Sequence, residues 1–168
     1  MREPVLILIG SKSDWEIMRE AGAVLDSVEV DWQVHVSSAH RALARTVELV
    51  RRAEVDGVKV FVCGAGMAAH LAGVVAASTV RPVIGVPLAG GIADGLDALL
   101  STVQMPAGVP VATVAAGKAG ARNAGILAAA ILATTDEALA TRLGRLKQEM
   151  AEAVAAADDA LQEERRSR

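Results

Sequence analysis

The sequence predicts an α/β domain in which helices cover both faces of a doubly wound parallel sheet. Short apolar segments alternate with amphipathic segments along the chain, and turns rich in glycine and serine separate them. The first apolar segment, Val5–Ile9, lacks the alternation of a half-exposed strand and suits a strand buried on both faces. Buried strands joined through helices are typical of parallel sheets.

Five segments are predicted as strands: Val5–Ile9, Val28–Val36, Val58–Cys63, Pro82–Val86 and Val111–Ala115. The second is more mixed in character and is expected at an edge, and Pro87 is expected to stop the fourth. Helices are expected from Ser13 or Asp14 through Leu25, from Leu43 to Asp56, from about Ala68 to Ser78, around Leu96–Leu100, and from Gly117 to about Ala133. This order predicts a three-layer αβα fold of flavodoxin-like or Rossmann-like type, with right-handed crossovers.

The last segment, about residues 134–164, is predicted as one long helix. Thr134 and Glu137 have the spacing of a capping box, and apolar residues recur at steps of three and four from Leu139 to Leu161. About 25 residues span about 35–40 Å, more than one face of so small a domain needs. We expect this helix to pack on a neighbouring subunit. A helix with a frayed, charged end is the alternative.

Composition narrows the functional classes. The 168 residues, without repeats or linkers, suit a single domain spanning 1–168. Two tryptophans, one phenylalanine and a net charge of −3 argue against nucleic acid or an acidic membrane as a partner. The lone Cys63 fits a reducing compartment, and no signal-peptide pattern or apolar run of membrane-spanning length is present. We expect a soluble cytoplasmic protein.

Four predicted strand ends carry residues that are unusual for simple turns. They are Gly10–Asp14, Ser37–Arg41, Gly64–His70 and Pro87–Gly91. In a doubly wound sheet the ligand crevice lies beyond the carboxyl ends of the strands. We therefore expect these turns to converge on a ligand site at one edge of the sheet.

The first of these turns, Gly10–Asp14, opens a helix, so its backbone N–H groups and hydroxyls could bind an anion. Asp14 could accept hydrogen bonds from a ribose. An ordinary strand-to-helix turn capped by Ser or Asp explains the same residues equally well, and the spacing of a Walker A loop is missing.

The third turn, Gly64–Ala69, matches the relaxed dinucleotide pattern G-x-G-x-x-A. The acidic residue that should follow about 20 positions later to hold a ribose is missing, because no Asp or Glu lies between Asp56 and Asp94. Binding of NAD is therefore not expected, and no other cofactor is indicated. A glycine turn that allows a small ligand to approach the backbone closely remains.

Two of the three histidines, His40 and His70, fall at strand-to-helix junctions, whereas His35 lies inside a strand and is expected to be structural. A lone histidine is usually a packed or solvated residue, but two at one edge favour a functional role. Beside Arg41, His40 would place a proton-transferring base next to an anion-binding cation. No ligand spacing indicates a metal site, and Cys63 is not expected to act as a nucleophile. A phospho-acceptor receiver domain would need clustered acids after the first strand, which this chain lacks.

At these residues the sequence closely resembles the class I 5-(carboxyamino)imidazole ribonucleotide mutases of bacterial purine synthesis, also known as the catalytic subunit of phosphoribosylaminoimidazole carboxylase. The match covers nearly the whole chain. Its markers are Gly10-Ser11-Lys12-Ser13-Asp14, Ser38-Ala39-His40-Arg41, Gly64-Ala65-Gly66 with Ala68-Ala69-His70-Leu71, Gln104-Met105-Pro106 with Gly108-Val109-Pro110-Val111, and Gly117-Lys118-Ala119.

The resemblance implies a cofactor-free rearrangement that moves a carboxylate from the exocyclic nitrogen of the substrate to carbon 4 of its imidazole. It implies that carbon dioxide is released into a closed pocket and recaptured, with His40 as the general acid and base. The implied ribose-phosphate ligands are Ser11, Ser13, Asp14 and Arg41, joined by Ser38 as a substrate-binding residue, and Gly66, Ala69, His70 and Leu71 line the carboxylate and carbon dioxide pocket. An octamer and a functional link to an ATP-dependent carboxyaminoimidazole ribonucleotide synthetase are implied as well.

The chain departs from the family pattern in places. Ala42 and Leu43 replace Thr-Pro, Met67 replaces Gly, Ala72 replaces Pro, and the loop from Pro87 to Ile92 is atypical. Met67 adds bulk beside the expected pocket.

Two alternatives to the mutase stay open. One is direct carboxylation of aminoimidazole ribonucleotide with free carbon dioxide, as in the animal-type class. That class typically has Lys where Arg41 stands and lacks an Ala-Ala-His sequence, so both features favour the mutase. The other is a nucleotide-binding paralogue that keeps the phosphate site without turnover.

Overall fold

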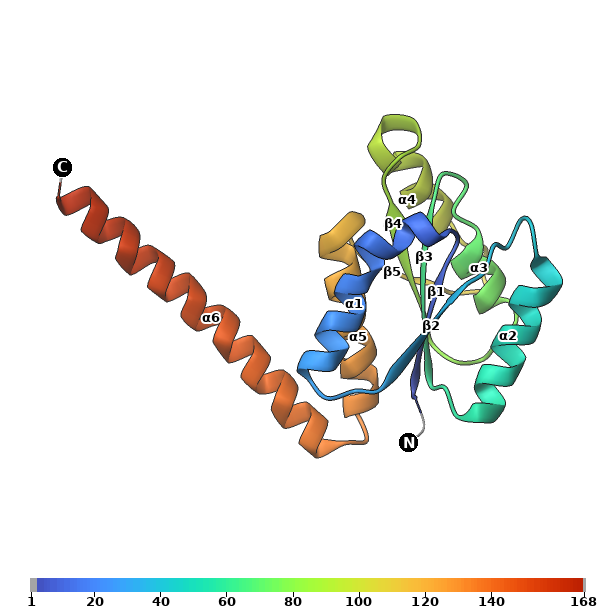
Figure 1. Cartoon of the computed structure of the whole chain (residues 1–168), viewed down its shortest axis with the longest axis horizontal. Coiled ribbons are helices and arrows are strands. Elements are labelled where there is room, and N and C mark those ends of the chain that lie inside the picture. The colour runs from blue at the N-terminus through green and yellow to red at the C-terminus, as the bar shows by residue number, and fades with distance from the viewer. Residues whose placement is uncertain (1–2, 168) are drawn as a thin grey trace.

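The computed structural model describes residues 3–167, and its centre is a five-stranded parallel sheet (Figure 1). The strands are β1 (Val5–Ile9), β2 (Trp32–Val36), β3 (Val60–Gly66), β4 (Val83–Leu88) and β5 (Ala112–Thr113). Their order is β2-β1-β3-β4-β5, with every neighbouring pair parallel. This is the flavodoxin-like order, so the predicted fold class and the edge position of the second strand are confirmed.

Helices cover both faces of the sheet, with α1 and α5 on one side and α2 and α3 on the other (Figure 1). They are α1 (Trp15–Ser27), α2 (Leu43–Asp56), α3 (Leu71–Ala76), α4 (Leu96–Val103), α5 (Gly117–Ala133) and α6 (Glu137–Arg166), with short 3₁₀ turns η1 (Lys12–Asp14) and η2 (Ile92–Gly95). No helix among residues 3–167 is long and apolar enough to span a membrane.

The central strand β1 shows why an apolar run forms this fold. Val5, Ile7 and Ile9 pack into the hydrophobic cluster under α1 and α5. Leu6 and Leu8 point the other way, into the cluster under α2 and α3. Because side chains alternate along a strand, a strand with helices on both faces must be apolar throughout.

The predicted element ends differ from the observed ones at identifiable points. β2 begins at Trp32 rather than Val28, because the N–H of Val28 still donates to the carbonyls at the end of α1. Pro87 does not stop β4, which continues to Leu88. β4 pairs with β5 only at two earlier residues, so on that side the missing N–H of Pro87 breaks no ladder bond. β3 runs on to Gly66, and α3 begins only at Leu71.

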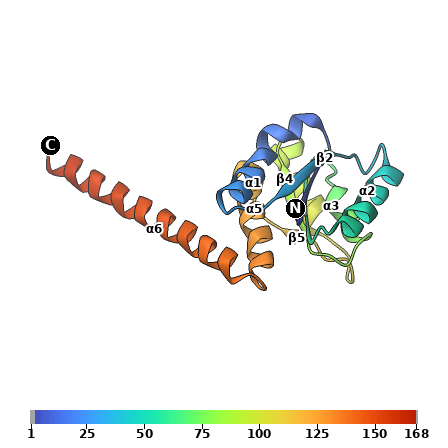
Figure 2. The ribbon, with the colours of Figure 1, turned by 60° about the horizontal axis from the view of Figure 1, so that its bottom comes forward.

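Helix α6 extends away from the rest of the chain in both views (Figures 1 and 2). Its N-cap is Asp136, whose Oδ1 accepts a hydrogen bond from the N–H of Leu139 at 2.9 Å. The predicted capping box of Thr134 and Glu137 is therefore wrong. Thr134 belongs to the end of α5, where its hydroxyl donates to the carbonyl of Ile131 at 2.7 Å.

Only the first turns of α6 are covered by the rest of the chain. Leu139 and Leu143 are buried, whereas Met150, Val154 and Leu161 are 45%, 71% and 60% exposed. The predicted apolar stripe thus exists, and its outer half lies open along the described chain.

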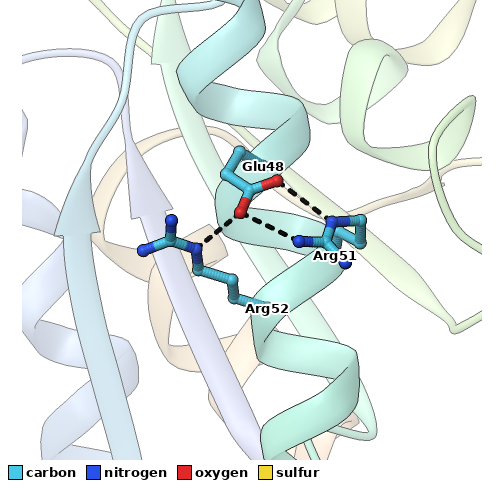
Figure 3. Close-up of polar contacts among 3 residues, drawn as sticks. All are labelled: Glu48, Arg51 and Arg52. Carbon is cyan, nitrogen blue, oxygen red and sulfur yellow. Dashed lines mark hydrogen bonds and ion pairs between the residues drawn. The ribbon is translucent and has the colours of Figure 1, made fainter.

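The outer face of α2 carries a cluster of exposed charges (Figure 3). Arg51 and Arg52 donate through Nε to opposite carboxylate oxygens of Glu48, at 3.0 and 2.6 Å. These hydrogen bonds, first from Arg51 and then from Arg52, lower the pKa of Glu48 to about 2. Because all three side chains are exposed, water screens the pairs and they add little to stability. This face is a solvated helix surface.

Candidate functional site

The turns after β1, β2, β3 and β4 meet around a cavity of about 670 Å³. The residues that line it are Gly10, Ser11, Ser13, Asp14, Ser38, Ala39, His40, Arg41, Ala65, Gly66, Met67, Ala68, His70, Leu71, Ala89 and Gly90. The structure therefore brings together the strand ends that the sequence singled out, at the carboxyl edge of the sheet.

Hydrogen bonds within the first turn fix its polar groups at the cavity wall. The Oγ of Ser11 accepts from the N–H of Ser13 at 3.4 Å and from its hydroxyl at 3.0 Å. The N–H of Ser11 donates to Oδ2 of Asp14 at 2.9 Å, which completes a capping box around η1. Ser11 is the N-cap of η1. Asp14 occupies the N-cap position of α1, as expected, although its side chain makes no cap hydrogen bond to that helix.

Asp14 is the polar group of this turn whose titration is perturbed. Partial burial raises the pKa of its carboxyl above the ordinary value of 3.8, and the hydrogen bond from the Ser11 N–H opposes that shift. A carboxylate that is held out of water without a cationic partner is costly to the fold. Its other carboxylate oxygen, Oδ1, can still accept hydrogen bonds from a ligand.

Replacing Asp14 with asparagine is expected to raise the melting temperature at neutral pH. A raised pKa means that the native state binds the proton more tightly, so stability falls as the pH rises from the ordinary range of aspartate through the raised pKa. Asparagine stays neutral and escapes this loss. Thermal unfolding at about pH 7 and about pH 3 should show a gain that shrinks at the lower pH. An equal gain at both pH values, or none at pH 7, would contradict this account.

A buried pair of hydroxyl groups holds the second turn to helix α2. The Oγ of Ser37 lies 2.8 Å from Oγ1 of Thr46 on α2, and both side chains are buried. The N–H of Ser37 donates to the carbonyl of Ile9 at 2.8 Å. These bonds hold the start of the His40 turn to both β1 and α2. Thr46 was not predicted as part of the site, although a threonine within the apolar stripe of α2 is a signal of such a buried bond.

Arg41 links the second turn to the first. Its Nε lies 3.3 Å from the Oγ of Ser38, and its Nη2 donates to the carbonyl of Gly10 at 3.4 Å. The guanidinium therefore stands beside the hydroxyls and backbone N–H groups of the first turn. A fork of charged donors in that position suits a phosphate.

The two histidines meet across the cavity. Nε2 of His40 lies 3.0 Å from Nδ1 of His70, with the ring planes at 89° and the ring centroids 5.2 Å apart. A single proton can lie between these two nitrogens, so the tautomer of one ring dictates the role of the other. Both side chains are exposed at the cavity, where a ligand can reach them. His35 lies on β2 outside the lining.

The third turn supplies small residues and one large one. A Cβ at Gly66 would come within 3.2 Å of the carbonyl oxygen of Leu88, so the turn packs tightly on β4. Met67 follows with φ at 55°, a left-handed conformation that costs a residue with a side chain about 1–2 kcal/mol. Ala68 lines the cavity. Ala69, the expected pocket residue, is 2% exposed and lies beneath the turn, outside the lining.

All the other predicted site residues lie in the cavity wall. They are Ser11, Ser13, Asp14, Ser38, His40, Arg41, Gly66, His70 and Leu71. Among residues 3–167, no group of three or more His, Cys, Asp or Glu side chains could hold a metal ion. Cys63 is buried in β3, where burial raises the pKa of its thiol, and it does not line the cavity.

Together these groups can bind a phosphorylated small molecule and move a proton on it. The cationic and hydroxyl groups cluster at the first two turns, the histidines stand beside them, and the wall formed by the third and fourth turns is built largely of alanine and glycine. An anion site, a proton-transfer site and a small apolar compartment thus share one cavity.

Comparison with known proteins places the chain in a family. The sequence model of the AIR carboxylase family matches residues 4–153. The N5-carboxyaminoimidazole ribonucleotide mutase of Haemophilus influenzae is 49% identical over 144 residues, which cover 86% of this chain and 88% of that protein. The Bacillus subtilis protein of the same name is 48% identical over 161 residues, covering 96% and 99%.

The fold comparison agrees with the sequence comparison. The crystal structure of Treponema denticola PurE superposes with a TM-score of 0.85 at 26% sequence identity, covering 94% of this chain and 97% of that one. By sequence and by fold, this chain belongs to the AIR carboxylase family.

Proposed function

We propose that this protein is an N5-carboxyaminoimidazole ribonucleotide mutase of purine biosynthesis. Relatives that carry this name match at 48–49% identity over most of the chain. The observation that carries the proposal is the shared cavity, in which His40 and His70 stand beside Arg41 and the serines of the first turn. A mutase that acts on a ribonucleotide needs a site for the phosphate and a proton-transferring group near the imidazole, and both must be reached by one bound substrate molecule.

In the proposed reaction His40 donates a proton in the first step and accepts another proton in the second. It first protonates the exocyclic nitrogen while the bond from that nitrogen to the carboxylate carbon breaks, which leaves carbon dioxide and aminoimidazole ribonucleotide. Carbon 4 of the imidazole then attacks the carbon dioxide, and His40 removes the C4 proton to restore the aromatic ring. Protons and carboxylate balance without a cofactor, and a single histidine suits both steps.

The remaining residues would bind the substrate. Arg41 would hold the phosphate through its guanidinium, with Ser11, Ser13 and Ser38 as hydroxyl partners and Asp14 as an acceptor for ribose hydroxyls. The other proposed contacts are Gly66, His70 and Leu71 around the carboxylate, with the buried Ala69 behind them. A wall of small apolar groups excludes water and so favours recapture of carbon dioxide.

An assay of the purified protein with N5-carboxyaminoimidazole ribonucleotide, without ATP or added bicarbonate, tests the proposal. Formation of the C4-carboxylated product above an enzyme-free blank supports the mutase. Turnover only from aminoimidazole ribonucleotide plus carbon dioxide would identify a carboxylase instead. Binding of the ribonucleotide without turnover would identify a binding paralogue.

We further propose a homo-octamer in which α6 packs on a neighbouring subunit. The exposed apolar side chains of Met150, Val154 and Leu161 support it, because such a stripe on an extended helix is costly in water. We also propose a cytoplasmic location and a functional link to an ATP-dependent synthetase that makes the substrate.

Replacing Val154 with glutamate is expected to lower the assembly mass. A charge in the centre of the open stripe would be buried against an apolar neighbour at high cost. Analytical ultracentrifugation should show the wild type near eight chains of 17.3 kDa and the variant at smaller species. Glutamate at Ala155, an exposed alanine on the opposite face of the same helix, serves as the control and should leave the assembly mass unchanged. A wild-type monomer would contradict the octamer.

A further inference from the structure

We propose that Met67 is an apolar cover on the cavity, and that it limits the exchange of carbon dioxide between the site and the solvent. The inference rests on the proposed function and assigns a role to a residue outside the proton-transfer and phosphate groups.

Met67 lies at the rim of the cavity. It follows directly on β3, lines the same cavity as His40 and His70, and is nonetheless 65% exposed. A residue that lines the cavity and is also largely exposed lies where the cavity opens to the solvent. Two residues separate it from His70 along the chain, and both Met67 and His70 line the same cavity.

No neighbouring side chain could take its place. The other residues of the third turn that line the cavity before His70 are Ala65, Gly66 and Ala68, and the facing fourth turn contributes Ala89 and Gly90. None of these side chains extends beyond Cβ. The other long apolar residue of the described lining, Leu71, is 2% exposed and forms part of the floor. The cover on this side therefore depends on Met67.

The backbone at Met67 adds a second observation. Its φ of 55° lies in the left-handed region, which glycine adopts without steric cost and in which a residue with a side chain is strained. Backbone strain of this kind persists where the surrounding structure imposes it. Strained residues cluster at active and ligand-binding sites, so strain beside this cavity suggests a functional role. Here it fixes the direction in which a large side chain leaves the turn.

The proposed reaction needs such a cover because carbon dioxide must stay in the cavity until carbon 4 attacks it. Carbon dioxide is small, uncharged and held by few contacts, so its recapture depends on walls rather than on ligands. A methionine side chain has three rotatable bonds, so it can yield to an entering ribonucleotide and still fill the gap afterwards. By microscopic reversibility, any route that lets carbon dioxide leave also lets it enter.

The test compares two initial rates for each variant. One is the rate from N5-carboxyaminoimidazole ribonucleotide, and the other is the rate from aminoimidazole ribonucleotide with bicarbonate and carbonic anhydrase as the source of carbon dioxide. Met67→Ala removes the cover and keeps the strained backbone, whereas Met67→Gly removes both. Met67→Leu keeps apolar bulk. Ala93→Gly relieves a similar φ of 48° at a residue outside the cavity lining.

The ratio of the second rate to the first is expected to rise several-fold in Met67→Ala and Met67→Gly. It should stay at the wild-type value in Met67→Leu and Ala93→Gly. An unchanged ratio in both the alanine and glycine variants, with an active wild type, overturns the role of Met67 alone. An equal rise of this ratio in Ala93→Gly would also overturn the role of Met67, because relief of backbone strain outside the cavity lining would then have the same effect. A wild type without turnover from the first substrate overturns the proposed function and this role with it.

Discussion

Replacing His40 with asparagine is expected to lower turnover of N5-carboxyaminoimidazole ribonucleotide by about 10²–10⁴-fold while ribonucleotide binding stays close to the wild type. Asparagine keeps a short polar side chain in the turn but can neither give nor take a proton at neutral pH. The residues proposed to bind the phosphate and the ribose are other members of the cavity wall, so affinity should survive. Single-turnover rates and equilibrium titration with the product measure the two quantities separately.

His35→Gln is the matched control for this experiment. His35 lies on β2, is half-buried and does not line the cavity, so its replacement should leave turnover near the wild-type value. An active His40→Asn enzyme would contradict the role of His40. Equal losses in both variants would point to a general effect of replacing a histidine on this edge of the sheet.

Replacing Arg41 with methionine is expected to raise KM by about 10–100-fold with a smaller change in kcat. A hydrogen bond to a charged group contributes about 1.5–3 kcal/mol. The proposed contact of Arg41 with the phosphate would be the same in the ground state and the transition state, so its loss should act mainly on KM. Methionine keeps the length of the side chain and removes the charge. Steady-state kinetics and titration with inorganic phosphate as a competitor measure the loss.

Arg45→Met is the control for the loss of charge alone. Arg45 is exposed on α2 and lies outside the cavity lining, so KM should not change when its charge is removed. A KM for Arg41→Met that matches the wild type would show that the phosphate binds elsewhere. A fall in kcat alone would instead assign Arg41 to the chemical step.

The sheet and the edge that holds the cavity could be predicted because they follow from local patterns. Five successive apolar residues in β1 are explained only by burial on both faces, and the paired core clusters confirm it. Parallel strands place their carboxyl ends together, so His40 and His70 were expected on one edge. Their hydrogen bond was not predictable, because its 3.0 Å distance depends on two turns that are 30 residues apart in sequence.

Other details depend on contacts that no local pattern reveals. The choice between Ala68 and Ala69 as a lining residue turns on where β3 ends and α3 begins, and both ends lie several residues later than the apolar pattern indicated. The bond between Ser37 and Thr46 joins a strand end to a helix. The left-handed backbone of Met67 and the close approach of Gly66 to the carbonyl of Leu88 likewise depend on the folded chain.

Transfer of an isotopic label tests the central claim most directly. N5-carboxyaminoimidazole ribonucleotide labelled with ¹³C in its carboxylate is supplied to the wild-type protein in buffer that contains unlabelled bicarbonate and carbonic anhydrase. Carboxylate transfer inside the cavity predicts that the C4-carboxylate of the product keeps the label, measured by mass spectrometry against an enzyme-free blank. Product that carries the unlabelled carbon of the solvent pool would contradict the account.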